Sequence, residues 1–232
     1  MNIVAILAGG NGRRIGGDIP KQFLQIAGKS VIEYSMEAFQ KHSDIDEIVL
    51  VVPSTYISKC KIYQYIYPKI SAIIQGGDER YLSTLAVLNH YSKKNEDILI
   101  LHDAARPMIN KKMIDRMLIS LKTYNAAIVA VKSTDTIVQS HDKKVINAIF
   151  DRSSLFNVQT PQAFTFSVLR KAFELALQDK GFNATDDSAI VFNYLPNEPV
   201  AIIEGSTLNI KLTYPEDFLF LEKYIQSKNE NS

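Results

Sequence analysis

The chain has 232 residues, of which 46% are hydrophobic and 22% charged, and its formal net charge is +1. These fractions are ordinary for a globular protein and exclude an intrinsically disordered or collagen-like chain. A charge near zero gives no overall field for binding nucleic acid or an anionic membrane, so any anion site must be local. At about 150 residues per domain, the length predicts one large domain with room for an appendage.

Cys60 is the only cysteine, so no internal disulfide can form, and no cysteine or histidine cluster has the spacing of a zinc site. The apolar residues 3–7 follow Met1 without a basic segment before them. No apolar run approaches the roughly 18 residues of a membrane span. We therefore expect a cytoplasmic protein in a reducing compartment, without an export signal.

Short β-rich apolar runs recur along the chain and leave room for a helix between them. They lie at residues 3–7, 47–52, 72–75, 98–101 and 127–131. Amphipathic stretches with helical spacing of apolar residues lie between them, at 30–42, 81–91 and 111–124. This alternation predicts an α/β fold, with a doubly wound, mostly parallel sheet and helices on both faces.

The alternation of predicted strands and helices changes after residue 131. Two alternating segments, 136–139 and 145–149, flank the polar turn 141–144, which is a hairpin signal. The hairpin is either an extension of the sheet edge or an arm that reaches a second subunit, and the pattern favours neither. Beyond it we expect a helix at 167–178, strands at 200–204 and 209–212, and a closing helix that begins near Pro215.

A glycine-rich loop follows the first strand and is the strongest local signal. Residues 9–17 include five glycines, which allow a tight turn and expose backbone N–H groups to an anion. Arg13, Arg14 and Lys21 add positive charge against only Asp18. A merely tight strand-to-helix turn would explain one or two glycines but not these cations, so we interpret the loop as a phosphate cradle.

Two familiar phosphate-binding patterns do not fit this loop. A dinucleotide fingerprint that starts at Gly10 would need a glycine at Ile15. A Walker loop that starts at Gly12 reaches Gly17, but Asp18 then stands where that pattern needs lysine.

A second cluster, residues 102–107, follows the fourth strand. In open α/β sheets ligands bind at the carboxyl ends of the strands, so Asp103 should lie near the glycine loop. A carboxylate that faces a polyphosphate would repel it unless it binds Mg²⁺, which prefers one or two carboxylates plus phosphate oxygens. The alternative is that Asp103 caps the next turn and pairs with Arg106. Beside a phosphate cradle, we favour the metal role.

Several segments together resemble a known family, the 2-C-methyl-D-erythritol 4-phosphate cytidylyltransferases, and its close relatives, the ribitol-5-phosphate cytidylyltransferases. The resemblance runs from about residue 3 to residue 217. It is carried by the loop at 7–23 and by segments 76–80, 102–107, 135–136, 152–155, 159–164, 185–187, 204–205 and 209–211.

This resemblance implies a Rossmann-like nucleotidyltransferase fold, with residues 1–232 as one domain and a dimerisation arm at about 133–160. It also implies a reaction in which CTP and a sugar-alcohol phosphate give a CDP-alcohol and pyrophosphate, with Mg²⁺ or another divalent cation. The protein would be a homodimer with shared sites.

The resemblance also implies roles for individual residues. Arg14 and Lys21 would neutralise the triphosphate, and Asp103 would hold the metal. The residues implied to bind CTP are Ala8, Gly9, Gly10, Gly12, Gly77, Asp78 and Ser83. The residues implied to bind the alcohol phosphate are Arg106 and Lys211, with Thr136 and Arg152 from the partner's arm. Arg14, Lys21, Arg152 and Lys211 would be the catalytic set.

Two branches of the family remain open as to the alcohol. Residues 7–10 and 134–138 look like the ribitol branch, whereas 151–164, 181–189 and 204–212 resemble the methylerythritol branch more closely. The second set is longer and favours 2-C-methyl-D-erythritol 4-phosphate. Leu208 departs from the polar or acidic residue that many methylerythritol-type members carry there. Broader alternatives are a sugar-1-phosphate or cofactor nucleotidyltransferase and a non-catalytic nucleotide-binding protein on this fold.

Overall fold

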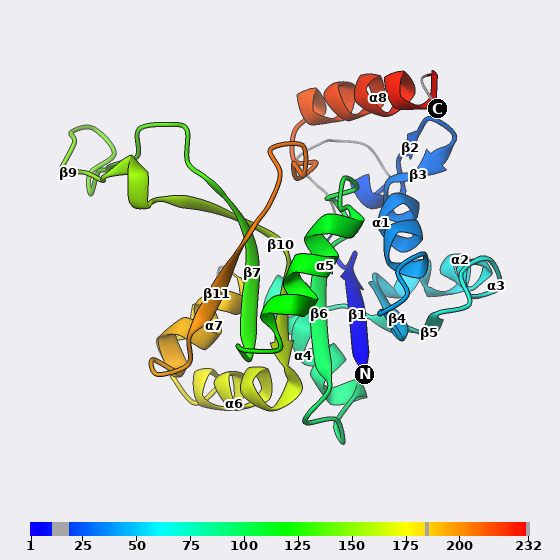
Figure 1. Cartoon of the computed structure of the whole chain (residues 1–232), viewed down its shortest axis with the longest axis horizontal. Coiled ribbons are helices and arrows are strands. Elements are labelled where there is room, and N and C mark those ends of the chain that lie inside the picture. The colour runs from blue at the N-terminus through cyan, green and yellow to red at the C-terminus, as the bar shows by residue number, and fades with distance from the viewer. Residues whose placement is uncertain (11–18, 184–185, 231–232) are drawn as a thin grey trace.

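The computed structural model describes residues 1–10, 19–183 and 186–230, so the predicted site residues Gly12 and Arg14 lie outside the described part. Its centre is a seven-stranded sheet with the order β11-β7-β10-β6-β1-β4-β5 (Figure 1). All neighbours are parallel except where β10 pairs with β6 and β7. The strands are β1 (Asn2–Leu7), β4 (Glu47–Val52), β5 (Ile70–Gln75), β6 (Ile98–Asp103), β7 (Ala126–Lys132), β10 (Phe156–Thr165) and β11 (Val200–Glu204).

Helices cover both faces of this sheet, as predicted. One face packs against α1 (Val31–Gln40), α2 (Ile57–Cys60), α3 (Ile62–Ile66) and α5 (Lys111–Ser120). The other packs against α4 (Arg80–His90), α6 (Phe166–Ala176) and α7 (Asp187–Tyr194). Along β1, Val4 and Ile6 join the first core, whereas Ile3 and Ala5 join the second. Burial on both faces explains why the parallel strands are continuous apolar runs.

The antiparallel strand β10 is absent from the sequence-based prediction. Its buried half contains Gln159, Thr160 and Gln162, and a proline normally argues against a central strand. Here Pro161 lies where the pairing with β7 shifts register between Val158 and Gln162, and the Thr160–Pro161 peptide is cis. The three polar residues can be buried there because their side chains bond to neighbouring segments of the chain.

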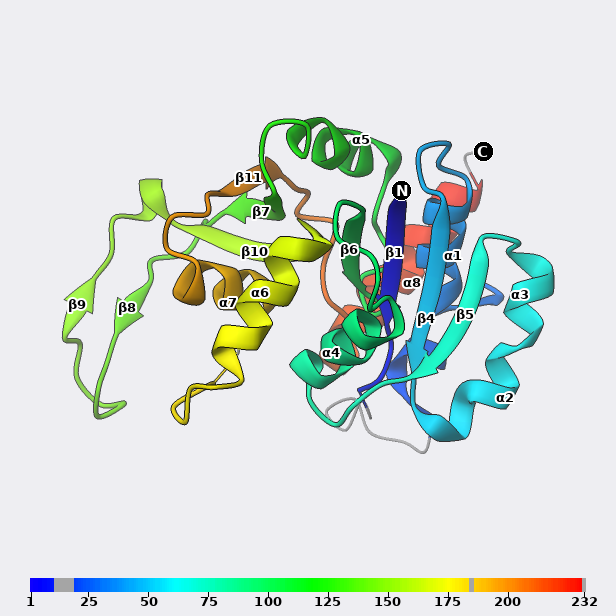
Figure 2. The same cartoon turned by 90° about the horizontal axis from the view of Figure 1, so that it is seen from below.

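The predicted hairpin is present and projects from the body of the molecule (Figures 1 and 2). Its ladder is short, with β8 (Val138–Gln139) paired only to β9 (Ala148–Ile149), so it does not extend the large sheet. The polar turn is where the sequence placed it, with Asp142 Oδ1 accepting hydrogen bonds from the backbone of Lys144 and Val145. A single-turn helix, Arg152–Ser154, leads from the hairpin into β10.

The predicted strand at 209–212 is wrong. The segment has no strand pairing, because its backbone groups bond to other parts of the chain. Arg106 Nη1 donates to the Asn209 carbonyl at 2.7 Å, and the Leu212 N–H donates to the Ala105 carbonyl at 2.8 Å. The closing helix begins where expected, as α8 (Pro215–Glu230). It packs with Leu212 and α1 over the small hairpin of β2 (Gln25–Ile26) and β3 (Lys29–Ser30).

Among the described residues, no helix has both the length and the apolar character needed to cross a membrane.

The central position of β10 gives a stability prediction. Phe164 is fully buried in β10, so Phe164→Ala should lower the free energy of unfolding by about 3–5 kcal/mol through lost burial and the cavity left behind. Urea unfolding followed by circular dichroism measures this change. Phe192→Ala is the matched control, because Phe192 is 71% exposed and its removal should change little. Equal effects of the two substitutions would contradict the packing described here.

Candidate active site

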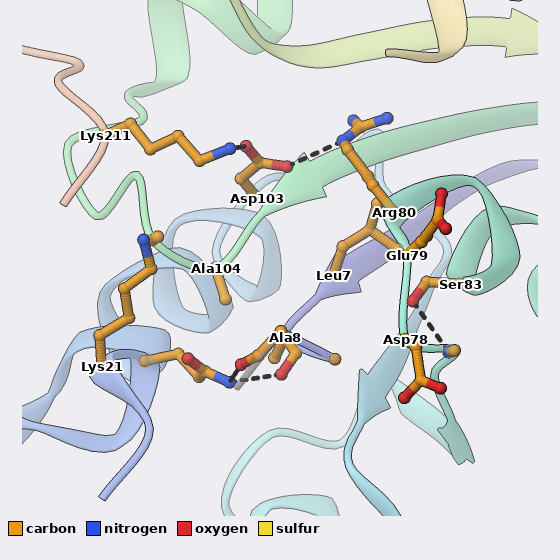
Figure 3. A pocket seen from close by; sticks show the side chains of 15 residues that line it. Leu7, Ala8, Lys21, Asp78, Glu79, Arg80, Ser83, Asp103, Ala104 and Lys211 are labelled. Carbon is orange, nitrogen blue, oxygen red and sulfur yellow. Dashed lines mark hydrogen bonds and ion pairs between the residues drawn. The ribbon is translucent and has the colours of Figure 1, made fainter. Parts of the chain in front are cut away.

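A cleft of about 270 Å³ opens at the carboxyl ends of β1 and β6 (Figure 3). Its walls come from residues 7–10, from 21–22, from 77–80 with Ser83, from 103–105 and from Lys211. These segments are distant in sequence and converge because parallel strands end at one edge of the sheet. The sequence predicted that the glycine loop lies near Asp103. The described start of the loop, Gly9 and Gly10, does line the same cleft as Asp103.

Backbone groups form one wall of the cleft. Gly9 and Gly76 pass so close to each other that a Cβ on Gly76 would lie 3.1 Å from the Gly9 Cα. The Gly77 N–H donates to Ser83 Oγ at 3.2 Å, which fixes the turn before α4. Gln22 Nε2 donates to the carbonyls of Ala8 and Gly10, at 2.5 and 2.9 Å. Gln22 thus holds the start of the glycine loop, a role for which the sequence carried no separate signal.

Asp103 is the charged centre of the cleft. Its carboxylate lies between Lys211 Nζ, 2.7 Å from Oδ2, and Arg80 Nε, 3.3 Å from Oδ1, which reach it from opposite sides (Figure 3). Burial would raise the pKa of Asp103, but the charges of Arg80 and Lys211 outweigh it and hold that pKa well below its usual range. Asp103 is therefore ionised at neutral pH.

His102 is buried at the end of β6, where its ring bonds to neighbouring segments. Burial lowers the pKa of His102 to about 4, so the ring is neutral at pH 7. Its Nε2 lies 3.1 Å from the Arg106 carbonyl and its Nδ1 lies 3.2 Å from Thr160 Oγ1. Thr160 Oγ1 in turn accepts from the Asp103 N–H at 3.0 Å. The ring therefore ties β10 to the end of β6 and to the loop that follows it, which carries Arg106.

The segment 209–212 closes the cleft on its remaining side. Lys21 Nζ donates to the Leu212 carbonyl at 2.5 Å. Asn209 is fully buried, and its Nδ2 donates to the Thr160 carbonyl at 2.9 Å. Between these two anchors, Lys211 extends its ammonium group to Asp103. Lys21 and Lys211 are thus both held at the cleft, from opposite ends of the sequence.

Comparison with known proteins identifies the family. The family model described as 2-C-methyl-D-erythritol 4-phosphate cytidylyltransferase (IspD) matches residues 2–227. The chain belongs to the IspD family. It is an enzyme of the cytidylyltransferase class, and the resemblance found in the sequence is confirmed.

Individual relatives agree on the class and differ in substrate. The 2-C-methyl-D-erythritol 4-phosphate cytidylyltransferase of Thermobifida fusca (strain YX) is 39% identical over 96% of this chain and 92% of that protein. The bifunctional ribulose 5-phosphate reductase/CDP-ribitol pyrophosphorylase Bcs1 of Haemophilus influenzae is 40% identical over 100% of this chain, which spans 49% of that protein. The 4-diphosphocytidyl-2C-methyl-D-erythritol synthase of Anaerococcus prevotii DSM 20548 superposes with a TM-score of 0.84 at 28% identity, over 97% of this chain and 96% of that one. The fold is therefore that of solved IspD-family structures.

Most of the predicted site residues that the structure describes line this cleft. They are Ala8, Gly9, Gly10, Lys21, Gly77, Asp78, Ser83, Asp103 and Lys211. Arg106 is not part of the cleft wall, and its guanidinium bonds to the Asn209 carbonyl instead of to Asp103. Arg80 lines the cleft and binds Asp103, although the sequence analysis assigned it no role beyond membership of the 76–80 segment.

Two predicted residues lie elsewhere. Thr136 and Arg152 are exposed on the arm and its base, and neither lines the cleft. Arg152 Nη1 donates to the Thr134 carbonyl at 3.1 Å. The sequence-based assignment already required them to act on a partner's site, so their position within one chain neither supports nor opposes that assignment.

Asp103 could supply one ligand to a magnesium ion that arrives with a nucleotide. Among the described residues, no three acidic, histidine or cysteine side chains are grouped so as to hold a metal by themselves. Mg²⁺ commonly takes one or two carboxylates and completes its shell with phosphate oxygens and water. Asp103 is ionised and lines the cleft, so it could be that carboxylate, and in this structure its two oxygens pair with Arg80 and Lys211.

The turn before α4 gives a second prediction. A Cβ on Gly77 would lie 2.2 Å from the Leu82 Cβ, so Gly77→Ala must displace the first turn of α4, which carries Arg80 and Ser83. We expect CTP binding, measured by calorimetry with Mg²⁺, to weaken about tenfold or more. Gly181→Ala is the control, because its Cβ would come no closer than 3.3 Å, to Asp179 Oδ1. Unchanged CTP affinity in Gly77→Ala would contradict this account of the cleft wall.

Proposed function

We propose that the enzyme transfers CMP from CTP to 2-C-methyl-D-erythritol 4-phosphate and releases pyrophosphate. The observation that carries this proposal is the convergence of Lys21, Asp103 and Lys211 on one cleft with a glycine-lined backbone wall. The longer of the two sets of branch-specific segments, which includes 204–212, supports methylerythritol phosphate as the acceptor. We propose a cytoplasmic location as well, in keeping with the single free cysteine, Cys60.

The proposed reaction requires the protein mainly to position the substrates and to stabilise negative charge. The nucleophile is a phosphate oxygen, which is already ionised at neutral pH, so no general base is needed. Catalysis then consists of in-line positioning and stabilisation of charge on the α-phosphate and the departing pyrophosphate. Lys21 supplies positive charge for the triphosphate. Mg²⁺, bound with the nucleotide, would neutralise further phosphate charge next to Asp103.

Lys211 has two tasks in this scheme. In the structure its ammonium neutralises Asp103. The proposed role of Lys211 is to bind the alcohol phosphate, which requires that the ammonium leave Asp103 Oδ2. The Lys211 side chain is 38% exposed, so its ammonium can leave Asp103 Oδ2 at little cost in burial. The same departure makes Oδ2 available to the divalent cation.

We propose that the arm, residues 133–160, binds a second copy of the chain and delivers Thr136 and Arg152 to that copy's cleft. The arm exposes many large apolar side chains, which a monomer would leave in water. Among them are Ile137, Val138, Val145, Ile146, Ile149, Phe150, Phe156 and Val158. The other described site residues, such as Arg106 and 76–80, come from the body of the chain. Each cleft would therefore combine the body of one copy with the arm of the other.

Ribitol 5-phosphate is the second candidate acceptor. The Haemophilus influenzae relative, whose name includes CDP-ribitol pyrophosphorylase, is 40% identical over the whole of this chain. Leu208 does not decide between the two. It lines a separate hollow with Tyr34 and Ile225, between α1 and α8, and is not part of the cleft wall.

The acceptor can be identified by pyrophosphate release. We expect the enzyme, with CTP and Mg²⁺, to use methylerythritol 4-phosphate with a kcat/KM about a hundredfold or more above that for ribitol 5-phosphate. Both alcohols should be measured in parallel with one enzyme preparation. The reverse preference would assign the ribitol reaction, and release with neither would reject both acceptors.

The shared site can be tested by mixing two inactive variants. Lys21→Ala and Arg152→Ala should each fold normally and lose on the order of 10²-fold in turnover, because each removes a cation from the phosphates. If Arg152 acts on the partner's cleft, a mixture of the two variants regains part of the activity, since a hybrid dimer contains one intact site. Lys112→Ala, on the exposed surface of α5, is the control for loss of a positive charge. Absence of recovery despite proven subunit exchange would contradict the arm assignment.

A further inference from the structure

Asp187 is a buried carboxylate that the proposed mechanism does not use. It is the first residue of α7, and its side chain is only 1% exposed. Its Oδ2 accepts a hydrogen bond from Arg80 Nη1 in an ion pair. Arg80 also reaches Asp103 through Nε, so one guanidinium connects α7 to the centre of the cleft.

The two oxygens of Asp103 have partners of different kinds. Oδ1 faces Arg80, whose side chain is 22% exposed and is tied at its far end to Asp187. Oδ2 faces Lys211, whose side chain is 38% exposed and carries a single flexible ammonium. Arg80 is thus held at two points. The more exposed Lys211 ammonium can leave Oδ2 more easily.

The four charged side chains form two balanced pairs, Arg80 with Asp187 and Lys211 with Asp103. Burial alone would lower the pKa of Arg80, but Asp187 and Asp103 outweigh it and raise that pKa, so Arg80 is always charged. Because its guanidinium pairs with Asp187 as well as with Asp103, the positive charge of Arg80 is shared between two carboxylates and offsets only part of the negative charge of Asp103. Without Asp187, the surplus charge of Arg80 would repel a divalent cation at the same carboxylate.

We propose that Arg80 is a positioning residue, which is neutralised by Asp187 and holds Asp103 Oδ1, so that Oδ2 faces a nucleotide-bound divalent cation. This inference rests on the proposed metal role of Asp103. Carboxylates that bind metals are commonly oriented by hydrogen bonds of this kind, and loss of such a partner weakens metal binding about 10- to 100-fold. Arg80 Nη2 is buried and has no hydrogen-bond partner among the described residues.

A purely structural role would give a different result. In that case Arg80 and Asp187 would only fasten α7 to the sheet, and their substitution would lower stability without a selective effect on the metal. Arg170 offers a matched comparison, because its guanidinium is also partly buried but bonds to the carbonyls of Leu88 and Tyr91, with no carboxylate partner in the described part of the chain.

The test measures Mn²⁺ binding by electron paramagnetic resonance in the presence of α,β-methylene CTP, which cannot transfer CMP. The wild-type protein should bind Mn²⁺ with the analogue, and Asp103→Asn should abolish that binding. Arg80→Lys keeps the charge but loses the two-point fork, so Mn²⁺ affinity should fall about tenfold. Arg170→Lys should leave Mn²⁺ affinity unchanged even if it lowers the melting temperature.

Asp187→Asn provides a second variant that keeps the shape and removes only the balancing charge. It should also weaken Mn²⁺ binding, and kinetics should show a raised Mg²⁺ requirement with a smaller loss of kcat at saturating Mg²⁺. Wild-type Mn²⁺ affinity in both Arg80→Lys and Asp187→Asn would overturn the positioning role while leaving the proposed function intact. A wild-type protein that binds no Mn²⁺ with the analogue would overturn the metal role of Asp103 and this inference together.

Discussion

The structure of this site depends on one constraint, the burial of a charged carboxylate at the end of β6. Asp103 is only 7% exposed, and an isolated buried charge would cost many kcal/mol. The fold meets this cost with Arg80 from the start of α4 and Lys211 from the loop before α8. Arg80 in turn requires Asp187 from the start of α7. Neutralising one carboxylate thus brings three distant segments to the same edge of the sheet.

The irregular segment 209–212 follows from the same requirement. A strand there would direct its N–H and C=O groups to a neighbouring strand. Instead the carbonyls of Asn209 and Leu212 accept from Arg106, which follows β6, and from Lys21, which lines the cleft. Lys211 is held between them and faces Asp103. Regular secondary structure is given up where the chain must present one lysine to the cleft and tie both sides of it together.

The features that follow from local sequence patterns were predicted correctly. The features that depend on contacts between distant residues were missed. Apolar runs buried on both faces identified the parallel strands, and the glycines with Lys21 marked the cleft. Strand β10 was missed because Pro161 and the buried Gln162 contradict the pattern of a central strand. The role of Arg80 was missed because its carboxylate partners lie 23 and 107 residues away, at spacings that no motif encodes.

The cleft walls also explain why the family is easier to assign than the acceptor alcohol. The wall residues supply backbone N–H groups and charges, which are suited to the phosphates that both reactions share. Discrimination between two sugar alcohols requires hydrogen bonds to hydroxyl groups, because unpaired polar groups then penalise the wrong substrate. Within the proposal, Thr136 is a polar, uncharged residue that would be delivered to the partner's cleft by the arm. On that proposal the acceptor would be selected where two chains meet, and a single chain would carry only part of the groups that select it.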